Sequence, residues 1–374
     1  MIKRQLFFIM THFLVEILDM WKKVYIKVWI VAFILVACKQ NGNPNYGEVK
    51  EYSLKHSFCS ELMMTSGRMQ LVDSFLVIVS HEQDKICSIY EIGDGDKVKE
   101  IADYGAIGAG PKEFVRPLLT GAYRNEFALN EINTRELALL SIEKSQKGIF
   151  VKEKTRLKAP YKPAKGELVL SDICFTRLDD ERFVSITSSG NGCFFTLSDR
   201  YLQPILRFGD SPIMEDLSPM ASRNRLGGSL ATFEGTMVYA ASKLPYLASY
   251  SWEKGTMKKN WSFFYDETNY AVSNSDLLFD REKAIGPLLD LKMDSEYIYV
   301  CYLDQLLGEY DFYDTKKSCS DKILIFDHQG KKHAVIHLDC RINEMVVDRK
   351  RGFLLAITQE PDMSLVKFQL PEGL

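Results

Sequence analysis

The stretch YGAIGAGPKEFVRP, residues 104 to 117, carries the glycines from which a phosphate-binding loop could be built. A dinucleotide loop has the order GxGxxG between a strand and a helix, so that backbone N–H groups at the helix start hold the phosphates. Here the order is GxxGxG, and Pro111 and Pro117 leave too few residues between them for a useful helix. We therefore expect a structural connection and no nucleotide site.

Histidine and cysteine are the usual ligands of a metal ion, and neither follows a recognised metal-binding pattern here. Three of the 6 histidines lie close together, and on a strand His333 and His337 would share one face, with His328 nearby. No third ligand follows at a typical spacing, and there is no HExxH motif. The 8 cysteines include no CxxC pair, and we expect those after Cys38 to be mostly free, buried thiols. We predict no metal site and no cofactor.

Paired carboxylates are the remaining groups that could catalyse a reaction. They occur at Asp94 with Asp96, at Asp179 with Asp180, and at Asp311 with Asp314. A glycosidase needs two acids that face each other across a cleft. The first two pairs lie in turn-like segments, where aspartate is favoured because it bonds its own backbone. Only the third pair is kept as a candidate, and no catalytic residue is assigned.

A repeated unit must position these side chains. A short turn between two strand-like apolar runs recurs at intervals of about 51 to 60 residues, which is near the period of propeller blades. The turns lie near Asp73, Arg124, Asp179, Glu234, Asp294 and Asp348. A second turn follows most of them, as expected for the outer hairpin of a four-stranded blade. The sequence therefore predicts an all-β protein, a six-bladed β-propeller.

The last repeat ends without a fourth strand, so another part of the chain must complete it. We expect the segment EVKEYSLKH, residues 48 to 56, to supply that strand, because closure of the ring removes exposed sheet edges. The propeller would then span residues 48–371 as a single domain. Short helices are candidates only at residues 273 to 284 and 302 to 322.

The N-terminus has the pattern of a bacterial lipoprotein signal. From Met20 the sequence has two lysines, an apolar run and then Leu-Val-Ala-Cys ending at Cys38, which is typical of a secretory signal. We predict residues 1–37 as a leader, Cys38 as the lipidated residue and residues 38–47 as a flexible tether. Residues 1 to 19 are explained by translation from Met20 or by an unusually long leader. A membrane-anchoring helix that ends in a chance cysteine is the alternative to lipidation.

Charge and tether together bear on partners and location. The formal net charge of −3 and the lack of a basic stripe give no sign of nucleic-acid binding, and we predict no nucleic-acid partner. Acylation of Cys38 would provide the two or more chains that stable membrane anchoring requires. Lys39 follows Cys38, and the tether has no acidic cluster of the kind associated with export to the cell surface. We therefore expect an outer-membrane protein that faces the periplasm. Surface display is the alternative.

With its six repeats and the stretch at 104 to 117, the chain resembles the TolB-like six-bladed propeller lipoproteins of Bacteroidetes. In that family the first crossover between blades reads G-x-G-P-x-E-F followed by a proline. The matching residues here are Gly108, Gly110, Pro111, Glu113, Phe114 and Pro117. Lys112 stands where the family usually has another glycine. The resemblance covers about residues 48 to 371 and implies a fold and an envelope location, but no reaction, since most members have no assigned activity.

The loops that this architecture gathers on one rim of the central channel are the candidates for binding. The crossover brings Lys112 and Arg116, the segment 208 to 228 brings Arg223 and Arg225, and the insertion 303 to 321 brings Tyr310, Phe312 and Tyr313. Aromatic and arginine side chains are enriched at protein contacts, and long loops are often functional. Capping of the channel is the alternative role of these loops.

We therefore predict a lipid-anchored, non-catalytic module that binds an envelope protein, a peptide or a glycan. The alternative is a hydrolase or lyase that uses carboxylates in the central channel.

Overall fold

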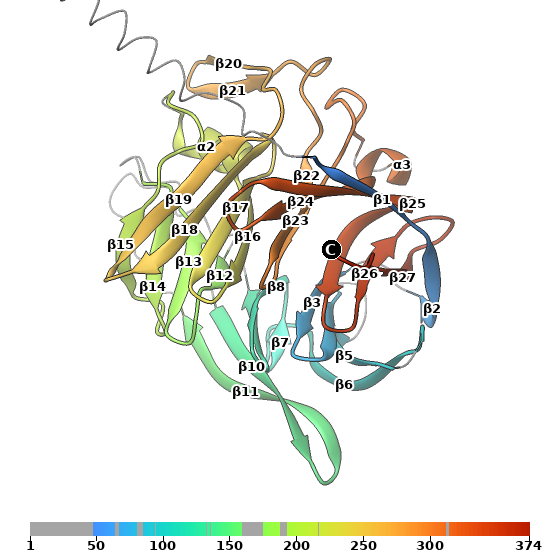
Figure 1. The fold of residues 1–374 in the computed structure, drawn as a ribbon. Helices are drawn as coiled ribbons and strands as arrows, with labels where there is room; N and C mark the ends of the chain where they lie inside the picture. The colour runs from blue at the N-terminus through green and yellow to red at the C-terminus, as the bar shows by residue number, and fades with distance from the viewer. Residues whose placement is uncertain are drawn as a thin grey trace, which may run out of the picture. The chain divides into compact units, whose positions relative to one another are not determined.

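The fold is a six-bladed β-propeller, as predicted (Figure 1). The structure is a computed structural model that describes residues 48–63, 67–80, 85–93, 95–131, 133–134, 136–158, 175–187, 193–215, 217–311 and 314–374. Within it, Glu48–Leu374 form one compact unit. Antiparallel pairing of neighbouring strands builds every blade.

The first four blades each contain four consecutive strands. Blade one holds β3 (Arg68–Val72), β4 (Phe75–Val79), β5 (Lys85–Ile92) and β6 (Val98–Ile107), with the short β7 (Glu113–Phe114) paired parallel to β6. Blade two holds β8 (Pro117–Tyr123), β9 (Glu126–Glu131), β10 (Glu136–Ser145) and β11 (Gly148–Lys158). Blade three holds β12 (Phe175–Arg177), β13 (Arg182–Ile186), β14 (Phe195–Asp199) and β15 (Pro204–Phe208). Blade four holds β16 (Gly228–Phe233), β17 (Thr236–Ala241), β18 (Tyr246–Glu253) and β19 (Thr256–Phe264).

Blades five and six are joined by one long strand. Their strands are β22 (Leu288–Met293), β23 (Tyr297–Tyr302), β24 (Ser320–Asp327), β25 (Lys332–Asp348), β26 (Phe353–Thr358), β27 (Ser364–Gln369) and β2 (His56–Met63). The first part of β25 pairs with β24, where Ala334 lies opposite Ile325. Its second part pairs with β26, where Met345 lies opposite Ala356. One strand is therefore the outer strand of blade five and the innermost strand of blade six.

An N-terminal strand completes the last blade, but it lies further along the chain than residues 48 to 56. The closing strand is β2, which pairs antiparallel with β27, so that His56 lies opposite Phe368. Most of the predicted segment instead forms β1 (Lys50–Leu54), which pairs parallel with the first part of β25. The physical reason is that blade five also has an open outer edge, which β1 covers before the chain reaches blade six.

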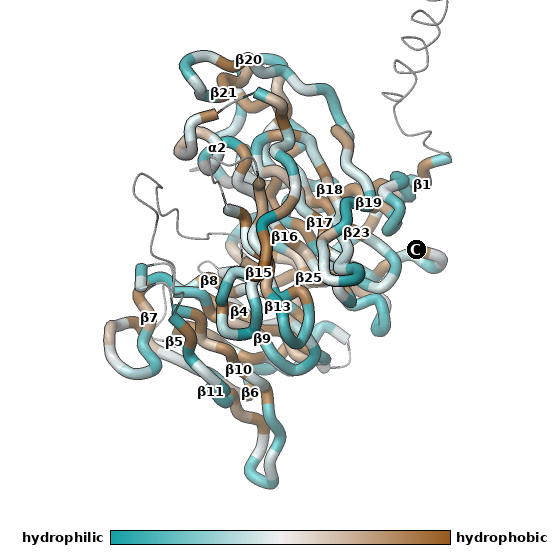
Figure 2. The backbone as a smooth tube through the Cα atoms, turned by 90° about the vertical axis from the view of Figure 1, so that its left-hand side faces the viewer, coloured by the Kyte–Doolittle hydropathy of each residue, from teal (hydrophilic) through white to brown (hydrophobic). Residues whose placement is uncertain are grey.

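The predicted repeat turns are tight hairpins that join the first and second strands of the blades. Asp73, Arg124 and Glu234 adopt positive φ angles of 54°, 56° and 44°, the left-handed conformation that two-residue hairpin turns require. The turn at Asp294 is held by the aspartate side chain. Its Oδ1 accepts hydrogen bonds from the N–H groups of Glu296 (2.8 Å) and Tyr297 (2.9 Å). Figure 2 shows hydrophilic residues at such turns and hydrophobic residues in the strands between them.

The hydrophobic core of the described residues lies between blades. Each pair of neighbouring blades encloses a cluster of buried residues, and alternate residues of one strand belong to different clusters. In β17, Met237 and Tyr239 pack toward blade three, whereas Val238 and Ala240 pack toward blade five. Strands buried on both faces need continuous apolar sequence. This explains why the second and third strands of many blades read as apolar runs.

Strand direction gives the ring two different faces. Because the strands of a blade alternate in direction, the blade-to-blade crossovers share one face with the loops between second and third strands. We call this the crossover face, and we call the opposite side, which carries the tight turns, the hairpin face. The longer segments of the crossover face contain α2 (Pro219–Leu226), the hairpin β20 (Tyr270–Ser273) and β21 (Asp276–Phe279), and α3 (Thr315–Ser318).

The predicted helix at 273 to 284 is wrong. Asn274 and Ser275 have φ angles of 51° and 57°, so they form a two-residue turn that joins β20 to β21. A helix forms instead at α2, where Ser218 Oγ accepts the N–H of Ala221 (3.2 Å) and Pro219 occupies the first turn. Among the described residues of the segment 302 to 322, only α3 is helical. None of the helices in the described ranges has the length and apolar character to span a membrane.

Candidate functional site

A cavity of about 510 Å³ occupies the crossover end of the central channel. The innermost strand of every blade lines it, namely β3, β8, β12, β16, β22 and the second part of β25. Residues outside the innermost strands also line it, among them Ile186, Phe194 and Ser222 of α2. A pocket of this size is within the range that holds small molecules or peptide ends.

One wall of the cavity is charged and is built by blades five, six and one. Lys292 Nζ lies 2.9 Å from Asp290 Oδ1 and 3.5 Å from Glu344 Oε1. Arg68 Nη1 lies 2.9 Å from Glu344 Oε2. The two carboxylates are almost fully buried, whereas Arg68 keeps 55% of its side chain exposed. Two acids and two bases therefore meet in the channel and balance each other's charge.

Burial and mutual proximity shift the pKa values of this charged wall. Burial and the negative charge of Asp290 raise the pKa of Glu344, and these effects outweigh the opposing charges of Arg68 and Lys292. Burial alone would lower the pKa of Lys292, but the Asp290 and Glu344 carboxylates outweigh it and raise that pKa. Lys292 therefore stays charged, and Glu344 accepts a proton more readily than an ordinary glutamate does.

The carboxylates also connect neighbouring blades. Asp290 Oδ2 accepts the backbone N–H of Met345 in blade six (2.9 Å), and Glu344 Oε1 accepts the N–H of Met69 in blade one (3.3 Å). The hydroxyl of Thr232 likewise bonds the carbonyl of Arg177 across blades four and three (2.7 Å). These acids therefore have a structural role that leaves each of them with fixed partners.

The opposite wall of the cavity is largely apolar. Its residues from blades two, three and four are Leu118, Leu119, Phe175, Ile186, Phe194 and Leu230. Phe175 stacks on Phe183 with ring centroids 4.9 Å apart, which holds it against its own blade. A ligand of mixed character, with one polar and one apolar side, fits such a cavity.

Sequence reasoning missed this charged wall. Asp290 and Lys292 are two residues apart, as are Arg68 and Gln70, and each pair lies in a strand whose other residues are mostly apolar. A polar residue at every second position of an innermost strand places those side chains on one face of that strand. That alternation in LLDLKM was the available signal, but it becomes meaningful only once β22 is known to line the channel.

The stretch at 104 to 117 forms the crossover from β6 to β8, and its glycines serve this turn. Glu113 Oε2 accepts the N–H of Gly110 (2.7 Å), and a Cβ on Gly108 would lie 2.0 Å from the same oxygen. Phe114 is buried and lies under the guanidinium of Arg156, which is 4.8 Å from its ring centroid. The N–H of Gly110 is therefore bonded within the turn.

The end of this crossover is held by a buried glutamate. Glu131 Oε2 accepts the backbone N–H groups of Val115 (2.7 Å) and Arg116 (2.8 Å). Pro117 follows directly and begins β8, the innermost strand of blade two. These bonds fix the segment as a blade connection, as the order of its glycines indicated.

The other candidate residues of the rim have different environments. Lys112 is exposed in the crossover, and Arg225 bonds Asp276 with both Nε (3.1 Å) and Nη2 (3.2 Å), which ties α2 to β21. Burial raises the pKa of Tyr310, with a further contribution from Asp311. Arg223 belongs to α2, but its side chain lies outside the described residues, as do Phe312 and Tyr313.

The remaining sequence candidates do not converge on a single site. His333 contacts the hydroxyl of Tyr297 (3.2 Å), and His328 contacts the carbonyl of Asp294 (2.9 Å). His337 faces Glu51 at 3.6 Å. Asp314 lies in the loop before α3, where it pairs with Lys317 at 3.5 Å, away from the residues that line the cavity.

The structure was compared with solved structures, and one of them has a similar fold. A protein from Bacteroides fragilis described as exported aligns with 87% of this chain and 100% of its own, with a TM-score of 0.52 and 11% identity. BamB from Moraxella catarrhalis aligns over 80% and 83%, with a TM-score of 0.38 and 13% identity. The Pan2 WD40 domain from Neurospora crassa aligns over 86% and 95%, with a TM-score of 0.43 and 9% identity. Only the first likeness is close enough to use, and it concerns the fold alone.

No family model matches the sequence, and no curated protein matches it either.

Proposed function

We propose that this protein is a non-catalytic binding module of the bacterial cell envelope, and that it binds a protein, a peptide or a glycan at its crossover face. The observation that carries the proposal is the distribution of exposed large apolar side chains. Most of those in the described residues belong to crossover-face segments: Ile107, Val115, Met214, Met220, Leu278 and Leu306. The cavity is lined from the same face. Exposed apolar side chains grouped around a cavity are typical of interaction sites.

The charged wall supports binding more than catalysis. General acid–base catalysis needs a group that changes its protonation state while it contacts the substrate. Asp290 and Glu344 share the ammonium of Lys292, and each accepts a backbone N–H from the next blade. Groups held in this way can orient a polar ligand, but their lone pairs are largely occupied.

Membrane attachment through Cys38 is part of this proposal. The lipobox-like sequence before Cys38 and the resemblance of the crossover to TolB-like propeller lipoproteins support it. An outer-membrane position facing the periplasm follows from the tether, with surface display as the alternative.

Replacement Cys38→Ser is expected to move the protein from the membrane fraction to the soluble fraction, whereas Cys59→Ser is expected to leave it in the membrane fraction. Protease treatment of intact cells separates the two orientations, since release of the propeller would contradict the periplasmic one.

Site-specific photocrosslinking in native membranes tests the binding face. A photoreactive residue at Met214, which is 99% exposed on the crossover face, is compared with one at Tyr201, which is 59% exposed in a turn of the hairpin face. We expect a discrete crosslinked product from position 214 only. Substitution Ser222→Trp, which fills the cavity mouth, should reduce that product, whereas Glu234→Trp on the hairpin face should not. Equal products from both faces would contradict the proposal.

A hydrolase or lyase is the second candidate, because one observation favours it. Two carboxylates line one channel cavity, and Glu344 has the raised pKa expected of a general acid. Wild type and Glu344→Gln should be compared on panels of glycoside and ester substrates. Turnover by wild type that falls by a factor of about 100 or more in Glu344→Gln would favour an enzyme. Absence of turnover in both would favour the binding module.

A further inference from the structure

Three side chains with metal-binding chemistry meet where β2 begins beside β25. They are His56, the first residue of the closing strand, with Asp339 and Cys340 of β25. One ligand atom from each lies within 4.8 Å of the others. This cluster lies outside the channel cavity and belongs to none of the motifs discussed above.

We propose that His56, Asp339 and Cys340 bind a zinc ion, which fastens the closing strand to the rest of the propeller. Imidazole nitrogen, thiolate sulfur and carboxylate oxygen are the three ligand types that zinc takes in proteins. Hard cations such as Ca²⁺ and Mg²⁺ prefer oxygen alone, so the mixture of nitrogen, sulfur and oxygen favours zinc. Three protein ligands leave a fourth tetrahedral position for water.

Burial at the cluster suits entry of an ion from one side. Cys340 is 7% exposed and lies deepest, whereas the side chains of His56 and Asp339 keep 20% and 37% of their surface. The ion can therefore approach over the imidazole and carboxylate and meet the thiol beneath them. The rings of Phe58 (4.8 Å between centroids) and Phe368 (6.1 Å) flank the imidazole and restrict its orientation.

The existing contacts already bring two ligand atoms to a suitable spacing. Asp339 Oδ1 lies 2.8 Å from His56 Nδ1 and also accepts the backbone N–H of His56 (3.0 Å). Two ligands of one tetrahedral zinc ion are about 3.3 Å apart, given bonds of about 2.0 Å. A small outward movement of the carboxylate would therefore admit the ion. The proton that Nδ1 donates to Asp339 would leave that nitrogen, and His56 would then ligate zinc through Nδ1 as the neutral imidazole with its proton on Nε2.

Binding of zinc must release a proton. Burial, with a smaller contribution from the charge of Asp339, raises the pKa of Cys340 to about 11, while a hydrogen bond with Thr358 opposes the shift. The thiol is therefore protonated without metal at neutral pH. When zinc binds, the S–H bond breaks, the proton leaves to solvent and the sulfur electron pair forms the Zn–S bond.

The consequence for the fold is a metal-dependent closure of the ring. Because an ion that binds only the folded state stabilises it by mass action, zinc should raise the melting temperature as its concentration rises.

Titration of the purified full-length protein with Co²⁺ and Zn²⁺ tests the site. Wild type should bind Co²⁺ with a thiolate-to-cobalt absorption band that Zn²⁺ abolishes, and Zn²⁺ should raise its melting temperature. Cys340→Ser should lose the band, and His56→Gln should weaken zinc binding more than about tenfold, the loss that changes around a metal site already cause. Cys193→Ser, which alters a thiol outside the cluster, should behave as wild type.

A variant that fails to fold can be told apart from one that folds but does not bind the metal. Urea unfolding in the presence of a chelator shows which variants fold, and the partly exposed Asp339→Asn provides a third test if Cys340→Ser does not. Absence of a thiolate band in folded wild type would overturn the proposal. An unchanged band in Cys340→Ser, or an equal zinc-induced shift in wild type and both His56→Gln and Asp339→Asn, would do the same.

Discussion

At the scale of single residues, the first crossover illustrates how a departure from a family pattern acquires a physical meaning. Lys112 stands where the propeller family that the sequence resembles usually has glycine, and in the structure it has a φ angle of 62°. A side chain in this left-handed region costs about 1–2 kcal/mol, whereas glycine adopts it freely. The pattern in the sequence marked the position, and the backbone supplies the reason for it.

Replacement of Lys112 by glycine should therefore stabilise the protein. We expect a gain of about 0.5 kcal/mol in the free energy of unfolding, because the relief of strain exceeds the extra entropy of glycine in the unfolded chain. Lys112→Ala is the matched control, since it removes the same side chain but keeps the strained conformation. Urea unfolding at constant m-value measures both variants. An equal effect of alanine and glycine would show that φ is not the cause.

The raised pKa of Glu344 predicts an unusual dependence of stability on pH. Burial and the charge of Asp290 raise it above the ordinary value of 4.5, so the folded state binds this proton more tightly than the unfolded state does. The contribution of Glu344 to stability is therefore complete below pH 4.5 and is lost as pH rises through the raised pKa. The free energy of unfolding of wild type, relative to Glu344→Gln, should decrease over that range.

Glu126 provides a control of opposite sign. Burial would raise its pKa, but hydrogen bonds from Arg177 and Lys154 outweigh burial and lower it. Its contribution is present above pH 4.5 and is lost as pH falls through the lowered pKa. Wild type should thus lose stability relative to Glu126→Gln on acidification. Two variants with the same sign of pH dependence would contradict these assignments.

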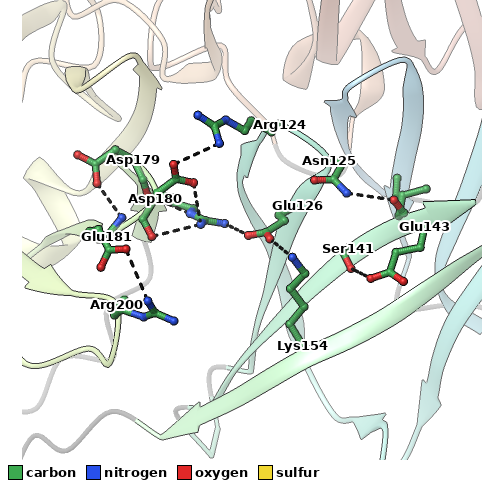
Figure 3. Close-up of polar contacts among 12 residues, drawn as sticks. Arg124, Asn125, Glu126, Ser141, Glu143, Lys154, Asp179, Asp180, Glu181 and Arg200 are labelled. Atoms are coloured by element: carbon green, nitrogen blue, oxygen red, sulfur yellow. Dashed lines mark hydrogen bonds and ion pairs between the residues drawn. The ribbon is translucent and has the colours of Figure 1, made fainter.

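At the scale of elements, β12 joins blades two and three through one buried arginine. Arg177 has 8% of its side chain exposed and pairs with Glu126 of β9, while its Nε bonds the carbonyl of Asp179 (3.0 Å). Lys154 of β11 also pairs with Glu126, and Arg124 pairs with Asp180 at 3.4 Å (Figure 3). The network therefore ties the innermost strand of blade three to three segments of blade two and to the turn that follows β12.

Removal of Arg177 should be far more damaging than removal of an exposed arginine in the same network. Arg177→Ala leaves Glu126 with one partner in a largely buried position, and loss of one member of a buried pair costs about 3–5 kcal/mol. Arg200, which is 56% exposed and lies 3.6 Å from Glu181, is the matched control. Arg200→Ala should cost less than about 1 kcal/mol. Urea unfolding measures both, and equal losses would contradict the role assigned to burial.

At the scale of the whole molecule, closure of the ring depends on two N-terminal strands with different partners. β2 covers the edge of β27 in blade six, and β1 lies along β25 in blade five. Val366 and Phe368 of β27 are fully buried in the closed ring. Without β2, the backbone edge of β27 would be available for pairing with other chains.

Deletion of these strands should separate their contributions. A chain that lacks residues 48–54 should still unfold cooperatively as a monomer, at a lower melting temperature, because β2 keeps its partner. A chain that lacks residues 48–66 should aggregate or lose cooperative unfolding. Size-exclusion chromatography and thermal unfolding distinguish these outcomes. If both deletions caused the same aggregation and the same loss of cooperative unfolding, β1 would be the strand that closes the ring, as the sequence suggested.

The sequence by itself determined the fold class and the number of blades. Turn residues at a regular spacing and apolar runs are local signals, and each blade repeats them, so one weak pattern is reinforced six times. Asp294 and its turn could be recognised in this way, because the carboxylate bonds its own neighbours. The crossover at 104 to 117 was likewise assigned from the order of its glycines.

Only the tertiary structure decided which side chains meet. Asp290 and Glu344 are separated by a whole blade in sequence, yet they share Lys292 because β22 and β25 both line the channel. His56 lies nearly the full length of the propeller before Asp339, and ring closure brings them together. Contacts between distant segments depend on how the blades pack and how the ring closes. The local strand and turn propensities of the sequence do not specify that packing.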